Sequence, residues 1–152
     1  DPGVSAQSMV AVGVRKVEME EVFEQSDIIS IHAPELPSTY HIVNEASIAS
    51  MKDGVILINT ARGTAIDEQA LAKALLSGKI KTACLDVYDP EPPCADNPLL
   101  KLDNCIMTPH LAGLANNGKL KIGAHVADEI GRFLTGGALV SEITQAMLAT
   151  IA

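Results

Sequence analysis

The sequence predicts an α/β protein with a doubly wound parallel sheet, and three features of the chain support this fold class. Short runs rich in β-branched residues alternate with segments whose apolar residues recur every three or four positions. The β-rich runs are almost uninterrupted in their apolar character, as in Val55-Ile56-Leu57-Ile58, which is typical of strands buried on both faces. Gly78 follows one helical segment at the place where a C-terminal glycine commonly lies. The alternation favours parallel strands joined by helical crossovers.

The first third of the chain is predicted to hold two strands and two helices. Residues 14–17 and 28–32 are short apolar runs of strand length. Residues 19–25 and 44–51 carry apolar side chains at three- or four-residue spacing, which indicates helices. Strand and helix therefore alternate from the start of the chain.

The middle of the chain carries the clearest signals. Residues 55–59 are expected to form a strand that runs into a polar turn. The helix predicted at residues 67–76 begins at Asp67, where a carboxylate can accept hydrogen bonds from the free backbone N–H groups of the first turn. Residues 82–87 and 104–108 complete the set of predicted strands.

The pattern changes beyond Gly113. One longer amphipathic helix is predicted at residues 117–134, and a second helix at residues 140–151 after a pair of glycines. We therefore expect one domain in residues 1–134, followed by a C-terminal tail helix within residues 135–152.

Composition and charge exclude several classes of protein. The chain has 152 residues, of which 47% are hydrophobic, and this is enough for the core of one domain. Its 19 acidic and 11 basic residues give a net charge of -8, which works against binding to nucleic acid. No apolar run approaches the roughly 18 residues of a membrane helix, and the first residues lack the pattern of a signal segment. We expect a cytoplasmic protein that binds neither nucleic acid nor membranes.

The three cysteines are expected to be reduced thiols. Cys84, Cys94 and Cys105 are odd in number and lack C-x-x-C spacing. Two of them lie inside apolar runs, where a small thiol simply packs. Metal ligation is the alternative, but no histidine or cysteine pair stands at ligand spacing, so we expect no metal site.

Polar side chains gather at the places where the predicted strands end. They are His32, Asn59, Arg62, Asp86, Glu91 and His110. In open α/β sheets, ligands bind in the crevice outside the carboxyl ends of the strands. The sequence therefore predicts an active site at that edge.

Three of these residues have chemistry that fits one reaction. The planar fork of Arg62 suits a substrate carboxylate held by two parallel hydrogen bonds. His110 can give or take a proton at a neighbouring hydroxyl or carbonyl oxygen, and Glu91, in the stiff proline-rich loop at residues 89–98, would orient the imidazole ring. This set, on a nucleotide-type sheet, is suited to hydride transfer between a 2-hydroxy acid and a nicotinamide.

Each polar residue also has a purely structural interpretation. Arg62 could be an ion-pair partner, Glu91 a solvated acid and His110 a hydrogen-bonded core histidine. His32 could be a polar strand end bonded to backbone. His41 and His125 end no predicted strand and are interpreted as surface residues. The order in which Arg62, Glu91 and His110 follow the strands favours the functional interpretation.

Several motifs, in order, resemble a known family. They are "SDIISIHAPELPSTYHIVNEASIASMKDGVILINTARGTAIDEQAL", "ACLDVYDPEPP" and "MTPHLAG". The chain resembles the nucleotide-binding domain of the NAD-dependent D-isomer-specific 2-hydroxyacid dehydrogenases, a family that includes phosphoglycerate dehydrogenase and glyoxylate/hydroxypyruvate reductase. The resemblance implies a Rossmann-like NAD-binding domain, a small 2-hydroxy or 2-oxo acid as substrate, and a homodimer.

The resemblance also assigns roles to single residues. Arg62 would bind the substrate carboxylate, His110 would be the acid/base, and Glu91 would be the partner of His110. Asp86 would contact the nicotinamide carboxamide, and Asp1 would hold the adenosine ribose, which favours NAD over NADP. The residues that would line the cofactor are Asp1, His32, Ala33, Pro34, Thr39, Thr60, Ala61, Asp86, His110, Ala112 and Gly113.

One family motif is not found in these 152 residues. The phosphate-binding turn G-x-G-x-x-G needs two glycines separated by one residue, and no two of the eleven glycines have that spacing. We therefore expect the chain to be the C-terminal part of a longer dehydrogenase that lacks the first two strands of the domain. The strand at residues 14–17 would then lose its neighbour, residues 28–32 would form a bare edge, and the last helices would expose an apolar face toward a missing substrate domain. The alternatives are a non-catalytic, NAD-sensing module like the corepressors of this fold, and a nonfunctional truncated product.

Overall fold

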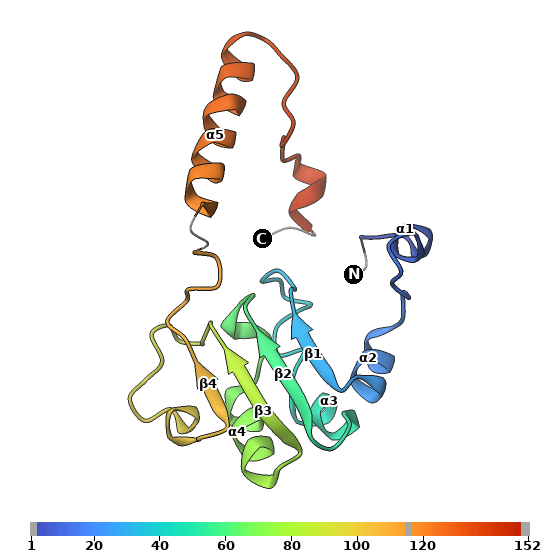
Figure 1. Ribbon diagram of the computed structural model, residues 1–152, viewed down its shortest axis with the longest axis vertical. Helices are drawn as coiled ribbons and strands as arrows, with labels where there is room; N and C mark the ends of the chain where they lie inside the picture. The colour runs from blue at the N-terminus through green and yellow to red at the C-terminus, as the bar shows by residue number, and fades with distance from the viewer. Residues whose placement is uncertain (1–2, 115–116, 150–152) are drawn as a thin grey trace.

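The computed structural model describes residues 3–114 and 117–149. Its centre is a sheet of four parallel strands in the order β1-β2-β3-β4, with helices between consecutive strands (Figure 1). The strands are β1 (Ile28–Ile31), β2 (Val55–Asn59), β3 (Ile80–Leu85) and β4 (Cys105–Met107). The α/β fold with a parallel sheet is therefore confirmed, and β1 lies at a sheet edge as expected.

Five α-helices and three short 3-10 helices complete the described chain. The α-helices are α1 (Ala6–Ala11), α2 (Met19–Gln25), α3 (Glu45–Ser50), α4 (Glu68–Ser77) and α5 (Gly118–Leu134). The 3-10 helices are η1 (Gly63–Ala65), η2 (Pro98–Lys101) and η3 (Gln145–Ala149). Helix α5 lies beyond the carboxyl ends of the strands and buries none of its side chains (Figure 1).

Local sequence signals set the ends of the central helix. Asp67 caps α4, and its carboxylate accepts hydrogen bonds from the N–H groups of Gln69 and Ala70 at 3.0 and 3.1 Å. Gly78 ends α4 with a φ of 78°, in the left-handed region that glycine adopts without steric cost. Both signals were predicted; Asp67 ends the turn between β2 and α4, and Gly78 begins the turn between α4 and β3.

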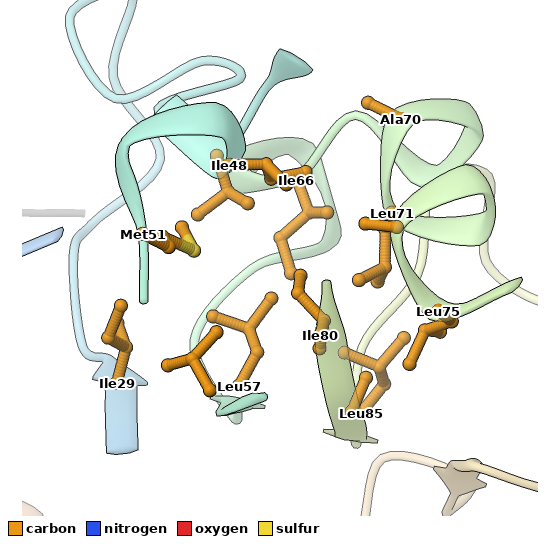
Figure 2. Packing of buried hydrophobic residues seen from close by; sticks show 14 of the residues in the cluster. Ile29, Ile48, Met51, Leu57, Ile66, Ala70, Leu71, Leu75, Ile80 and Leu85 are labelled. Atoms are coloured by element: carbon orange, nitrogen blue, oxygen red, sulfur yellow. The ribbon is translucent and has the colours of Figure 1, made fainter. Parts of the chain in front are cut away.

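The hydrophobic core lies between one face of the sheet and helices α3 and α4. Leu57, Ile80 and Leu71 are each 0% exposed, and Figure 2 shows side chains from both helices meeting those of the strands. Alternate strand residues point to the opposite face, where Ile58 is half-buried and Ile106 is exposed. The sheet is therefore buried on one face, and the prediction of burial on both faces is wrong for the other face of the described sheet.

Two predicted elements are wrong. Residues 14–17 form no strand, because an extended segment needs a neighbouring ladder and the described chain offers none beside it. Residues 140–151 form no α-helix in their described part, which contains only the turn η3. The backbone N–H groups of Val140 and Ser141 instead bond the carboxylate of Glu129 on α5.

Smaller differences concern element ends and one helix that was missed. The strand predicted at residues 82–87 begins and ends two residues earlier, because Ile80, two residues after the glycine that ends α4, already pairs with Val55. Helix α1 was not predicted, although Ser5 caps it by accepting a hydrogen bond from the N–H of Ser8. The apolar face of α5 is exposed as expected.

Candidate active site

The carboxyl ends of all four strands lie at one edge of the sheet because every strand pair is parallel. His32 follows β1, Arg62 comes three residues after β2, Asp86 follows β3, and His110 comes three residues after β4. The topology thus brings the chain segments that carry these residues to one edge of the sheet, as predicted (Figure 1).

The turn that carries Arg62 is held by a buried asparagine. Asn59 is 0% exposed; its amide nitrogen donates to the carbonyl oxygen of Arg62 at 2.8 Å, and its amide oxygen accepts from the N–H of Ala61 at 3.0 Å. The Arg62 guanidinium donates to the Ala61 carbonyl oxygen at 2.8 Å and has Nε 4.0 Å from a carboxylate oxygen of Glu35. A fixed backbone therefore presents an exposed guanidinium that keeps free N–H groups for an anion.

Glu91 and His110 are brought into contact from two different loops. Nδ1 of His110 lies 2.7 Å from Oε1 of Glu91, and the side chains are 52% and 39% exposed respectively. A carboxylate at Nδ1 favours the tautomer with its proton there, which leaves Nε2 to exchange a proton with a ligand. His110 has a φ of 53°, so its backbone lies in the left-handed region that a side chain disfavours.

Asp86 holds the backbone on both sides of His110. It is 3% exposed, and its carboxylate accepts hydrogen bonds from the Thr108 hydroxyl and, at 2.7 Å each, from the N–H groups of Leu111 and Ala112. Burial alone would raise the pKa of Asp86, but these three hydrogen bonds and the nearby His110 outweigh it and hold the pKa below its ordinary value. The carboxylate is therefore ionised, and it stabilises the left-handed turn at His110.

A cavity of about 280 Å³ opens beside this loop, on the face of the sheet opposite α3 and α4. Its lining is mostly apolar and includes Ile58, Thr60, Asp86 and Ala112. Three predicted cofactor residues thus share one cavity, and its apolar wall with a few polar groups suits a flat ring that carries an amide.

Other predicted cofactor residues lie away from this cavity. The hydroxyl of Thr39 donates to the carbonyl oxygen of Pro34 at 2.6 Å and accepts from the N–H of Leu36 at 2.9 Å, so it stabilises its own turn. Ala33 packs against the core. His32 is exposed, with Nε2 2.8 Å from the hydroxyl oxygen of Ser30.

Three predicted cofactor residues remain: Ala61, Gly113 and Asp1. Ala61 donates its N–H within the Arg62 turn and packs against the core. Gly113 is exposed, and Asp1 lies outside the described residues. Within residues 3–114 and 117–149, no group of three or more histidine, cysteine or acidic residues could hold a metal ion. No helix in the same part of the chain is long and apolar enough to cross a membrane.

Comparison with known proteins finds one family in both the family models and the sequence relatives. Residues 1–112 match the model of the family described as "D-isomer specific 2-hydroxyacid dehydrogenase, NAD binding domain". The chain is 41% identical over 136 residues to D-3-phosphoglycerate dehydrogenase of Archaeoglobus fulgidus and 44% identical over 119 residues to hydroxypyruvate reductase of Thermotoga maritima. These alignments cover 90% and 77% of this chain but only 26% and 39% of the two relatives.

A solved structure shows the same arrangement. The holo form of Rhodotorula graminis D-mandelate dehydrogenase superimposes with a TM-score of 0.84 at 33% identity, covering 93% of this chain and 41% of that one. The chain therefore spans between 26% and 41% of the length of these three proteins.

Proposed function

The chain belongs to the D-isomer specific 2-hydroxyacid dehydrogenase family, as part of its NAD-binding domain, and from this premise we propose that the whole protein transfers a hydride between NAD(H) and a small D-2-hydroxy or 2-oxo acid. The observation that carries the proposal is the 2.7 Å contact between Glu91 and His110 at the sheet edge that also presents Arg62. This edge combines an anion anchor with a proton donor that a carboxylate supports.

Each residue would have a separate task in the reduction of a 2-oxo acid. Arg62 would hold the substrate carboxylate, which fixes the orientation of the neighbouring carbonyl group. His110 would donate a proton from Nε2 to the carbonyl oxygen, and Glu91 would stabilise the charged ring through Nδ1. Oxidation of the 2-hydroxy acid would move the same proton in reverse.

The nicotinamide would lie in the cavity lined by Thr60, Asp86 and Ala112, where it supplies or accepts the hydride when bound. The apolar wall of this cavity of about 280 Å³ suits one flat ring. The choice of NAD over NADP rests on Asp1, whose carboxylate would favour a free ribose 2′-hydroxyl.

The test is turnover by the complete protein that contains this chain, with NADH or NADPH and a panel of 2-oxo acids. His110→Gln should lower kcat by about 10²- to 10⁴-fold, the usual range for loss of a general acid/base. The matched control is His125→Gln, because His125 is an exposed histidine on α5 that bonds the hydroxyl of Ser141. NADH binding without turnover of any 2-oxo acid would contradict the proposal and favour the NAD-sensing alternative.

A further inference from the structure

Glu68 is a half-buried acid that the proposed reaction does not use. It is the first residue of α4 and follows directly after the cap Asp67. One carboxylate oxygen accepts the backbone N–H of Asp89 at 3.1 Å, and the other accepts the side-chain amide of Asn97. One side chain thus binds both ends of residues 89–97 of the proline-rich loop, and this segment carries Glu91 near its start.

The two ends of this loop are well fixed, whereas its middle is open. Asn97 is 8% exposed, and its amide oxygen caps η2 by accepting the N–H of Leu99 at 3.0 Å. Tyr88, just before the loop, is 7% exposed, and its hydroxyl lies within hydrogen-bond distance of the carbonyl oxygens of Leu85 and Thr108. Residues 89–92 and 94–96 between these ends are exposed. The conformation of the loop therefore depends strongly on how its ends are held together.

The same region joins the loop to the Arg62 turn. Gly63 is buried directly against the backbone of Tyr88, where a Cβ atom would lie 2.0 Å from the Tyr88 carbonyl carbon. Helix α4 begins only a few residues after this contact, and Glu68 reaches from its first turn to the loop. The turn that carries Arg62 therefore packs against Tyr88, directly before the loop that carries Glu91, so one continuous region of the chain holds both.

We propose that Glu68 is a positioning residue, which places the carboxylate of Glu91 against Nδ1 of His110 by closing the loop at residues 89–97 onto α4. The acid/base role of the Glu91–His110 pair rests on the proposed function, whereas the positioning of Glu91 by Glu68 does not. Glu68 touches neither substrate nor cofactor in this role and acts only through Glu91.

The direct readout is the tautomer of His110 in the complete protein, measured from ¹⁵N chemical shifts of the imidazole ring at a pH where the ring is neutral. The contact with Glu91 predicts the tautomer protonated at Nδ1. Glu68→Gln should shift the ring toward the tautomer protonated at Nε2, because Glu68 accepts hydrogen bonds at both oxygens and an amide cannot accept at both of its ends.

Two further variants keep the test decisive. Glu45→Gln is the matched control, because Glu45 is an exposed acid that follows the cap of α3 at the same helix position, and it should leave His110 unchanged. Glu68→Asp keeps the negative charge at the N-terminus of α4 but is too short to reach both loop ends, so it should shift the tautomer even if Glu68→Gln fails to fold. A His110 tautomer that stays the same in a folded Glu68→Gln or Glu68→Asp variant overturns the proposal.

Kinetics of the complete protein separate this proposal from the proposed function. Glu68→Gln should lower kcat about 10- to 100-fold with little change in KM for the 2-oxo acid, since a misplaced acid/base slows the chemical step. Adding Glu68→Gln to Glu91→Gln should produce almost no further loss. If the complete protein has no dehydrogenase activity but the tautomer still shifts, the positioning role stands and the proposed function fails. Additive losses in kcat would contradict the positioning role alone.

Discussion

Gly63→Ala would add a methyl group where the backbone of Tyr88 leaves no room for it. A Cβ atom at Gly63 would lie 2.0 Å from both the carbonyl carbon and the carbonyl oxygen of Tyr88, and 2.6 Å from its Cα. Carbon atoms in contact normally lie about 3.5 to 4.0 Å apart, so the new methyl group would come roughly 1.5 Å too close. Because all three neighbours are backbone atoms, no change of rotamer can relieve the overlap.

The cost follows from the segments that must move. Overpacking of a well-packed core typically costs about 1 to 3 kcal/mol, and displacement of two hydrogen-bonded backbone segments places this change at the upper end, about 3 kcal/mol. The free energy of unfolding should fall by this amount in urea denaturation of the 152-residue chain followed by circular dichroism. The Arg62 turn would also move away from the loop that carries Glu91, so the complete protein should lose affinity for its substrate.

Gly123→Ala is the matched control for this measurement. Gly123 lies within α5 and has no atom within 4 Å of its would-be Cβ. The same added methyl group should therefore be neutral or stabilise by about 0.5 to 1 kcal/mol, as expected for alanine in a helix. A loss below about 1 kcal/mol for Gly63→Ala would show that the two turns are not packed as described.

Four more predictions concern single residues and one motif. Arg62→Lys in the complete protein should lower kcat/KM by about 10- to 150-fold, because a point charge cannot replace a two-pronged contact worth about 1.5 to 3 kcal/mol; near-normal kcat/KM would remove Arg62 from the site. Cys94 is exposed and should react first with a thiol reagent, whereas burial raises the pKa of Cys105 to about 11 and should make it react slowly, as timed thiol titration would show. Asp86, whose pKa is lowered in the folded state, should stabilise the fold above about pH 3.9, the ordinary aspartate pKa, with the contribution lost as pH falls through the folded pKa. Asp86→Asn should therefore be less stable near neutral pH and change less on acidification in urea titrations. The 152-residue chain should bind NADH several orders of magnitude more weakly than a chain with a G-x-G-x-x-G turn, because each pyrophosphate hydrogen bond is worth about 1.5 to 3 kcal/mol; micromolar binding by calorimetry would refute this.

The parts of the fold that were predicted correctly are those that local sequence determines. Helix α2 and strand β2 have the predicted bounds, and Asp67 and Gly78 delimit α4 through hydrogen bonds and a backbone conformation of their own. Such signals act within a few residues of the chain and need no tertiary partner. Asn59, the last residue of β2, acts over the same short range and holds the turn that carries Arg62.

The wrong elements are those whose conformation depends on distant groups. Residues 14–17 have strand-like composition but no neighbouring ladder in the described chain. The segment after α5 has helical spacing, yet the N–H groups of Val140 and Ser141 bond Glu129, which lies 11 and 12 residues earlier. Periodicity in a sequence contains no information about such a partner.

In the candidate site, too, the features visible in single residues were predicted, and those that depend on distant partners were not. The order of Arg62, Glu91 and His110 along the chain identified the exposed groups, because their chemistry is visible in single residues. Their supports were not identified: Glu68 bonds Asn97 from 29 residues away, and the Asp86 carboxylate bonds the N–H of Leu111 from 25 residues away. A first-turn glutamate in a helix is ordinarily explained by the helix dipole, so nothing in the sequence distinguished Glu68.

Substitutions of the exposed groups and substitutions of the buried residues that hold them should have different effects. Among the described residues, no buried side-chain nitrogen or oxygen lacks a hydrogen-bond partner, so Asn59 and Asp86 stabilise the fold while they hold the exposed Arg62 and His110 in place. Removing a partner from a buried polar group costs about 1 to 3 kcal/mol, whereas surface substitutions usually stay within about 0.5 kcal/mol. Changes in the supports should therefore lower stability and activity together, and changes in Arg62 or His110 should lower activity alone. Stability measured beside kcat thus separates the residues that do the chemistry from those that hold them.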